Sequence, residues 1–292
     1  DPRRDCSAYI EAAAAEGMAI THILETHRNE DYVTGSVELA GRTGAAVLHS
    51  AHDDLPYEYG EPIQDGDAIQ VGRLRLSALH TPGHTPGHMS YVLHDASGAP
   101  WVVFTGDTLF AGEVGRTDFL GQENLDKMTG LLYDSLFEKI LPLGDGVMVC
   151  PAHGAGSVCG SGIADRFWTT VGLERLHNPR LQHRARDDFV RNVGRMLPYP
   201  PYMEIVERLN LQGAPLPGGR LPEPIPLAAE EFAARAPDAW VVDTRDLMSF
   251  SAARVPGALA LWENEISKYA GWFLTQDKPI LLVCDVDRIE QV

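Results

Sequence analysis

Two features that the sequence lacks restrict the functions it can have. Basic residues are few: 24 Lys and Arg stand against 41 Asp and Glu, which gives a formal net charge of −17. Because a nucleic-acid-binding surface needs clustered Lys and Arg, we expect no nucleic-acid partner and assign the acidity to solubility. Long apolar runs are also missing, and none approaches the roughly 18–20 residues that span a bilayer. We therefore expect no membrane partner either.

Cysteines are sparse as well. The chain has four of them, and no two form a C-x-x-C pair; they are Cys6, Cys150, Cys159 and Cys284. This scatter excludes a cysteine-rich zinc site and does not resemble a disulfide framework. A reducing, cytoplasmic location fits it best. Since the chain opens at Asp1 with no initiator Met, we expect it to be a fragment.

The order of helical and strand-like segments indicates a layered α/β architecture over residues 1–195. A length of 292 residues suggests about two domains. We expect a helix followed by the entry to a strand over 8–20, and further helices over 33–44 and 123–141. The expected strands are 20–27, 45–51, 67–80, 89–95, 100–107 and 146–154, and residues 67–80 alternate apolar and polar side chains as a half-buried strand does.

The composition changes after residue 195. Residues 196–226 are rich in Pro and Gly, which is typical of a linker. A second α/β unit follows over 227–292, with strands expected at 239–245 and 279–285. The chain stops about 66 residues into this unit, which is short for an independent domain. We therefore expect the carboxyl end to be cut.

Histidines are concentrated in the first part of the chain, where eight of the eleven lie between His22 and His94. Three of them, His80, His84 and His88, alternate with a repeated Thr-Pro-Gly. Pro fixes φ and Gly permits turns closed to other residues, so this loop can hold imidazoles rigidly. The alternative is a surface turn that carries incidental histidines.

Three further candidate ligands also follow strand-like runs: His27, Asp107 and His153. Loops at strand ends commonly build sites. A buried Asp is costly unless it is paired or metal-bound, and a metal would supply the partner that Asp107 needs. The pattern thus predicts a metal site made from several loops.

These loops resemble, in order and spacing, the four metal loops of the metallo-β-lactamase superfamily. They read T-H-R-N-E-D-Y from Thr26, G-H-T-P-G-H from Gly83, F-T-G-D from Phe104 and P-A-H-G from Pro151. The run from Phe104 to Phe119, which includes G-R-T-D-F, resembles the persulfide dioxygenase branch and also the glyoxalase II branch. The resemblance covers roughly residues 1–200 and implies an αββα sandwich with the metal between two sheets. It also implies two strands before Asp1, which supports an N-terminal truncation.

The first motif departs from the superfamily's pattern, T-H-x-H-x-D-H. Asn29 replaces the second histidine and Tyr32 replaces the last. Binuclear zinc hydrolases of this fold use both histidines, one on each metal, and a phenol is a poor substitute for imidazole on zinc. A second metal would keep at best Asp31, Asp107 and His153. The departures therefore argue against the usual two-metal centre.

The resemblance to persulfide dioxygenases implies one Fe²⁺ per chain, held by His27, His84 and Asp107. Two histidines and one carboxylate leave open positions for O₂ and substrate. The expected reaction oxidises a low-molecular-weight persulfide, such as glutathione persulfide, to sulfite and free thiol, and the resemblance suggests a homodimer. One alternative is a glyoxalase II-type thioester hydrolase that uses a Zn²⁺-bound water. The other is a catalytically degenerate sulfur carrier or scaffold.

Residues near the predicted ligands have expected roles too. Arg116 could orient a substrate carboxylate or persulfide, or it could form a structural ion pair with Asp118. We expect Thr105 and Asp118 to orient other groups rather than to react. His153 matches a metal-loop position and would support a mononuclear site from outside its ligand set. We expect His80 and His88 to be packing or loop residues.

The second unit resembles the opening of a rhodanese (sulfurtransferase) domain. The resemblance rests on Asp243-x-Arg245 after a strand and on R-V-P-G-A from Arg254. An active rhodanese carries its nucleophilic Cys in a C-x-x-G-x-R loop, and Cys284 stands at that place. The loop here lacks the Gly at 287 and has Arg288 one position early, and Asp285 and Asp287 would raise the thiol pKa. We therefore expect an inactive, C-terminally truncated rhodanese-like domain.

Overall fold

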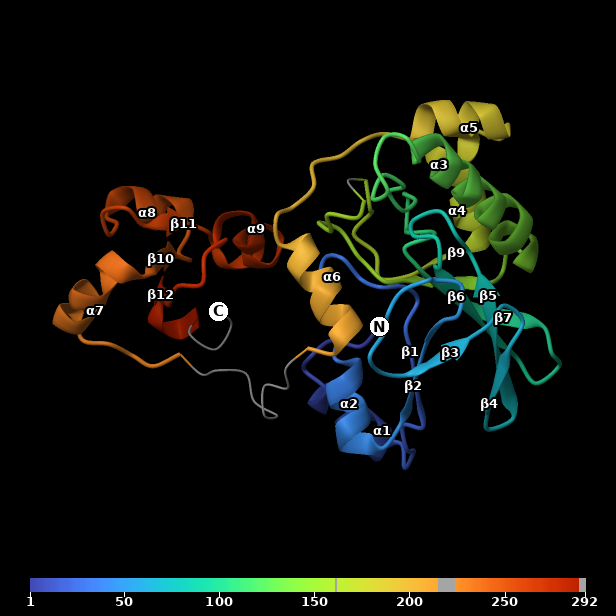
Figure 1. Cartoon of the computed structure of the whole chain (residues 1–292), viewed down its shortest axis with the longest axis horizontal. Helices are drawn as coiled ribbons and strands as arrows, with labels where there is room; N and C mark the ends of the chain where they lie inside the picture. The colour runs from blue at the N-terminus through green and yellow to red at the C-terminus, as the bar shows by residue number, and fades with distance from the viewer. Residues whose placement is uncertain (161, 215–223, 289–292) are drawn as a thin grey trace. The chain divides into compact units, whose positions relative to one another are not determined.

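The computed structural model describes residues 1–160, 162–214 and 224–288, and the chain forms two compact units (Figure 1). The first unit contains Asp1–Pro198 together with helix α6 (Met203–Gln212). The second contains Tyr199–Tyr202 and the elements from helix α7 (Ala229–Arg235) onward. Among the described residues, no helix is long and apolar enough to cross a membrane.

Two sheets form the centre of the first unit. One has three parallel strands in the order β1-β2-β3, with the bounds β1 His22–Leu24, β2 Ala46–Ser50 and β3 Glu61–Ile63. The other has six strands in sequence order; they are β4 Ala68–Val71, β5 Leu74–His80, β6 Met89–His94, β7 Pro100–Gly106, β8 Met148–Pro151 and β9 Thr169–Thr170. Its neighbours are antiparallel except β7 and β8, which run parallel.

The helices of this unit other than α6 fall into two groups. The helices near the first sheet are α1 (Ser7–Ala15) and α2 (Ser36–Thr43). Those near the second sheet are α3 (Leu125–Asp134), α4 (Val171–His177) and α5 (Arg186–Val193). Helix α3 runs on through a π-helical segment, Ser135–Ile140, so the expected helix over 123–141 is confirmed with a change of pitch near its end.

Three buried apolar clusters define the layers. The first joins α1 and α2 to the small sheet, for example Cys6 with Ile23. The second lies between the two sheets and includes Ile63 and Met89. The third, the largest, packs strands β6–β8 against α3–α5 and includes Phe189. Burying one such side chain contributes about 1.5–3 kcal/mol. The clusters give the layer order helix, sheet, sheet, helix, in agreement with the predicted αββα sandwich.

The structure differs from the expected elements in two places. Residues 67–80 form a hairpin of β4 and β5 rather than one strand, because Gly72 adopts a φ of +59° and reverses the chain. Within the expected linker, Met203–Gln212 form α6, which buries Met203, Val206 and Asn210. A packed helix therefore lies within the stretch predicted to be a linker, since an amphipathic helix can bury one face despite the prolines around it. Residues 215–223 of the same stretch lie outside the described residues.

The second unit contains a parallel three-stranded sheet in the order β11-β10-β12. Its strands are β11 Leu259–Ala260, β10 Trp240–Asp243 and β12 Ile280–Val283, and its further helices are α8 Leu247–Ala252 and α9 Ile266–Phe273. The two strands expected from the sequence are thus present. The central strand β10 buries Val241 and Val242.

Candidate metal centre

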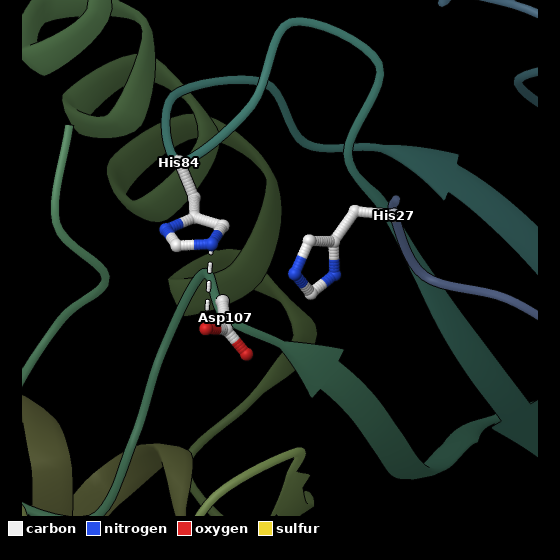
Figure 2. A group of neighbouring side chains, drawn as sticks. All are labelled: His27, His84 and Asp107. Carbon is white, nitrogen blue, oxygen red and sulfur yellow. Dashed lines mark ion pairs between the residues drawn. The ribbon is translucent and has the colours of Figure 1, made fainter. Parts of the chain in front are cut away.

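Four loops at the carboxyl ends of strands build one buried cluster, as the sequence predicts. His27 follows β1, His84 lies in the loop after β5, Asp107 follows β7 directly, and His153 follows β8. Figure 2 shows His27, His84 and Asp107 pointing toward one another from three separate chain segments. The αββα framework therefore brings together residues up to 126 positions apart, counted from His27 to His153.

The three predicted iron ligands form one close group. One ligand atom from each of His27, His84 and Asp107 lies within 4.8 Å of the others, and all three residues are buried. His84 Nε2 lies 3.4 Å from Asp107 Oδ2 (Figure 2). Two imidazoles and a carboxylate at this spacing can hold a divalent transition metal.

Hydrogen bonds on the far side of each ring orient the two histidines. The Nδ1 of His84 lies 2.9 Å from the carbonyl oxygen of Arg116, so it must carry the proton and donate. The Nδ1 of His27 lies 2.8 Å from Thr26 Oγ1, which itself donates to Asp1 Oδ2 at 2.6 Å. That hydroxyl has its proton engaged and accepts from His27. Both Nε2 lone pairs therefore face the cluster, as a metal ligand requires.

The loop that carries Asp107 is held by His88. The backbone N–H of Asp107 donates to His88 Nε2 at 2.9 Å, and burial lowers the pKa of His88 to about 3, so this ring stays neutral. Gly106, at φ +48°, passes so close that an added Cβ would lie 2.6 Å from His88 Nε2 and from Thr26 Oγ1. Thr105 Oγ1 donates to the carbonyl of Leu109 at 2.7 Å and so orders the same turn. The side chains of Thr105 and His88 thus support the turn that carries Asp107.

The electrostatics of the cluster favour a bound cation. Burial would raise the pKa of Asp107, but His153 and His84 hold it well below its usual range. Burial would lower the pKa of His153, yet Asp107 and Asp31 raise it to about 9. Asp31 and Glu30 are buried carboxyls whose pKa values are raised by burial. Several acidic groups thus share a space from which water is largely excluded, and a divalent cation would compensate their charge.

Buried polar atoms without a hydrogen-bond partner indicate whether these residues could hold a metal ion. Among the described residues, eight buried nitrogen and oxygen atoms of this cluster have no hydrogen-bond partner: His27 Nε2, His84 Nε2, His153 Nε2, both carboxylate oxygens of Asp107 and of Glu30, and Asp31 Oδ1. Leaving one such atom unsatisfied costs roughly 1–3 kcal/mol. Coordination of a metal ion would explain why these atoms converge. The donor set therefore fits a metal.

A second group adjoins the first. Ligand atoms of Asp31, His153 and Cys159 lie within 4.8 Å of one another. His153 Nε2 lies 3.4 Å from Asp31 Oδ2 and 3.4 Å from Asp107 Oδ1, so Asp107 connects the two groups. Burial and the nearby Asp31 raise the pKa of Cys159 well above its usual value, which keeps the thiol protonated without a metal.

Asn29 and Tyr32, which replace superfamily histidines, are both engaged by Asp1. The Asn29 amide donates to Asp1 Oδ1 at 3.2 Å and to the carbonyl of His27 at 3.3 Å. The Tyr32 hydroxyl donates to the carbonyl of Asp1 at 3.0 Å. Burial and the charge of Asp31 raise the pKa of Tyr32 well above its usual value, so the phenol keeps its proton.

Arg116 is locked into an ion pair. Its Nε and Nη2 donate to the two oxygens of Asp118 at 2.7 and 2.8 Å, and the guanidinium also donates to the carbonyls of Leu197 and Pro198. The side chain is almost completely buried. This geometry agrees with a structural ion pair, one of the two roles that the sequence left open for Arg116. The backbone carbonyl of Arg116 orients His84.

Sequence reasoning missed two residues of the cluster, Glu30 and Cys159. Glu30 stands between two motif positions and could have been found as an acid inside a metal-loop motif. Cys159 carries no local signal, because five residues of irregular loop separate it from His153. Only the folded loop brings its sulfur to Asp31.

Comparisons with known proteins agree with this geometry. Residues 1–153 match the family model of the metallo-beta-lactamase superfamily. The mitochondrial persulfide dioxygenase ETHE1 of Homo sapiens is 34% identical over 202 residues, which cover 67% of this chain and 70% of that protein. The hydroxyacylglutathione hydrolase GloC of Haemophilus influenzae is 29% identical over 63% of this chain and 87% of its own. A crystal structure of a metallo-beta-lactamase from Staphylococcus aureus matches with a TM-score of 0.87 and 29% identity, over all of this chain and 85% of that one.

Proposed function

The chain belongs to the metallo-β-lactamase superfamily, and from this premise we propose that it is a persulfide dioxygenase with one iron(II) per chain. The substrate would be a low-molecular-weight persulfide such as glutathione persulfide. One persulfide, one O₂ and one water would give the free thiol, sulfite and two protons. Persulfide dioxygenases are among the curated relatives of the chain, at 33–34% identity.

One observation carries the proposal. At the two positions where binuclear hydrolases of this fold place histidines, Asn29 and Tyr32 are hydrogen-bonded to Asp1. The imidazoles of His27 and His84 and the carboxylate of Asp107 remain, with unpaired atoms that converge. This ligand set supports a centre with one metal ion better than the two-metal centre of the hydrolases.

Iron(II) bound there would supply open coordination positions for O₂ and for the persulfide sulfur. The residues of the chain would do the rest. Thr26 and the Arg116 carbonyl engage the Nδ1 atoms of His27 and His84, which leaves their Nε2 atoms toward the metal, and His88 fixes the turn that carries Asp107. The Nε2 of His153 lies 3.4 Å from Asp107 Oδ1, and in its protonated form His153 would stabilise the anionic persulfide and the sulfite that forms.

A hydrolase is the second candidate, and a specific observation favours it. Asp31, His153 and Cys159 offer a further ligand set beside Asp107, which could recreate a two-metal centre. A hydroxyacylglutathione hydrolase is also among the curated relatives. A zinc-bound water would then attack a thioester.

Metal analysis combined with an oxygen electrode separates the two candidates. The protein is loaded anaerobically with Fe(II) or with Zn(II), and each form is given glutathione persulfide and, separately, a hydroxyacylglutathione thioester. We expect about one iron per chain and O₂ uptake that equals the persulfide consumed, with no thioester cleavage. Two zinc ions per chain together with thioester cleavage would instead establish the hydrolase.

We further propose that residues 227–292 are a rhodanese-like domain that does not transfer sulfur. The parallel strands β10–β12 and the position of Cys284 after β12 support the resemblance. Partial burial and Asp285 raise the pKa of Cys284, whereas a sulfurtransferase needs a thiolate. Arg288 pairs with both oxygens of Glu263, at 2.8 and 2.6 Å, and so is not free to bind an anion.

Replacing the thiol tests this inactivity. Cys284→Ser is expected to leave the thiosulfate:cyanide sulfurtransferase rate unchanged within error, at the background of the uncatalysed reaction. The measurement is thiocyanate formation by the full chain and by the variant. A rate above background that Cys284→Ser abolishes would show an active domain.

The domain boundaries, the thiol carrier, the homodimer and the cytoplasmic location stay predictions.

A further inference from the structure

The carboxylate of Glu30 faces both histidines of the candidate metal centre. Its Oε2 lies 3.5 Å from His84 Nε2 and 3.6 Å from His27 Nε2. The side chain has no exposed surface. A fully buried carboxylate needs a charged partner, because burial of a charge is costly unless it is paired. The candidates here are a protonated His84, the Arg28 guanidinium and a metal ion.

Hydrogen bonding does not explain this geometry. Both oxygens of Glu30 lack a hydrogen-bond partner among the described residues. The separations of 3.5 and 3.6 Å are long for an N–H···O bond. They are close to the spacing of two ligands of one ion, since ligand atoms each about 2.1 Å from a metal lie about 3.0–3.5 Å apart.

The neighbouring position explains why a carboxylate is available. The superfamily pattern places a histidine where this chain has Asn29, and Asn29 turns its amide to Asp1 and to the His27 carbonyl. The next residue, Glu30, brings its oxygen to the two ring nitrogens instead. A carboxylate one residue along the chain thus offers a ligand atom from the same loop.

We propose that Glu30 is a fourth protein ligand of the metal, which makes the site a two-histidine, two-carboxylate centre. The inference rests on the proposed function, because it assumes a metal between His27, His84 and Asp107. Two carboxylates neutralise the charge of a divalent ion. Four protein ligands would leave one fewer open position for O₂ and the persulfide than three do.

A structural role for Glu30 is the competing explanation. Arg28 Nη2 lies 3.6 Å from Glu30 Oε1, and the same nitrogen lies 3.3 Å from Glu207 Oε1. Glu30 could be buried only as the partner of this arginine. Arg28 therefore offers the matched control, since its removal breaks that ion pair and leaves the carboxylate in place.

The test measures metal binding without any substrate. Glu30→Gln, Glu30→Ala and Arg28→Ala are titrated anaerobically with Fe(II) and with Co(II), alone and against a competing chelator. We expect at least about a tenfold weaker affinity for both Glu30 variants and a shifted Co(II) visible spectrum, with Arg28→Ala unchanged in both. Wild-type affinity and spectrum in the Glu30 variants would overturn the proposal, as would an equal loss in Arg28→Ala.

An anaerobic crystal structure of the iron-loaded wild-type chain decides the matter without any variant. A Glu30 oxygen within about 2.3 Å of the iron supports the assignment. An oxygen beyond about 3 Å overturns it. These readouts do not depend on catalysis: a wild-type protein that binds iron through Glu30 but consumes no O₂ would refute the proposed function and leave the ligand assignment intact.

Discussion

His84→Ala is expected to abolish both iron retention and persulfide-dependent O₂ uptake. His84 Nε2 lies 3.4 Å from Asp107 Oδ2 and has no hydrogen-bond partner, which is the position that a metal ligand would take. Loss of residues that merely orient a ligand costs about 10–100-fold in metal affinity. Loss of the ligand itself should cost at least about 100-fold. The measurement is iron per chain after desalting, followed by O₂ uptake with glutathione persulfide.

His80→Ala is the matched control, because His80 belongs to the same Thr-Pro-Gly loop. Its Nε2 donates to the carbonyl of Pro86 at 2.8 Å and its ring stacks on His52, outside the metal cluster. We expect this variant to keep about one iron per chain. The assignment fails if His84→Ala keeps wild-type iron affinity, or if the two variants lose iron equally. The melting temperatures of the two metal-free variants identify any loss that is due to misfolding alone.

The positions of the site loops could be predicted from the sequence because each lies beside a strong local signal. His84 is fixed between two Pro-Gly steps, and Asp107 follows an apolar strand directly. The turn requires a glycine at position 106, because an added Cβ would lie too close to His88. These local signals do not depend on the rest of the fold. They identified His27, His84 and Asp107 as residues of one site.

The parts that the sequence did not predict depend on contacts between distant segments. Met203–Gln212 forms a helix whose Asn210 donates to the carbonyls of Asn29 and Tyr32, more than 175 positions away along the chain. Such contacts override the local preference of a Pro-rich region. Cys159 reaches Asp31 for the same reason. Glu30 was overlooked because the pattern of the family assigns no ligand to its position, whereas the unpaired carboxylate became visible only in the folded chain.

The guanidinium of Arg116 is expected to contribute more to stability than to substrate binding. Arg116→Ala would leave Asp118 buried and without its bidentate partner. Breaking a buried pair in this way costs about 3–5 kcal/mol. For a unit of about 200 residues, that corresponds to a fall of roughly 6–20 °C in melting temperature. The measurement is thermal unfolding of the metal-free protein, followed by circular dichroism.

A role in substrate binding predicts a different pattern for the same variant. If Arg116 held the persulfide, Arg116→Ala would raise KM for the persulfide and leave the melting temperature nearly unchanged. The structural role predicts the reverse. It also predicts that Arg116→Ala/Asp118→Ala is less destabilised than the sum of the two single variants, because the double variant leaves no unpaired charge. Arg116→Lys should recover only part of the loss, since an ammonium cannot make the two parallel bonds that fix Asp118. A raised KM without destabilisation would instead support the role in orienting the substrate that the sequence left open for Arg116.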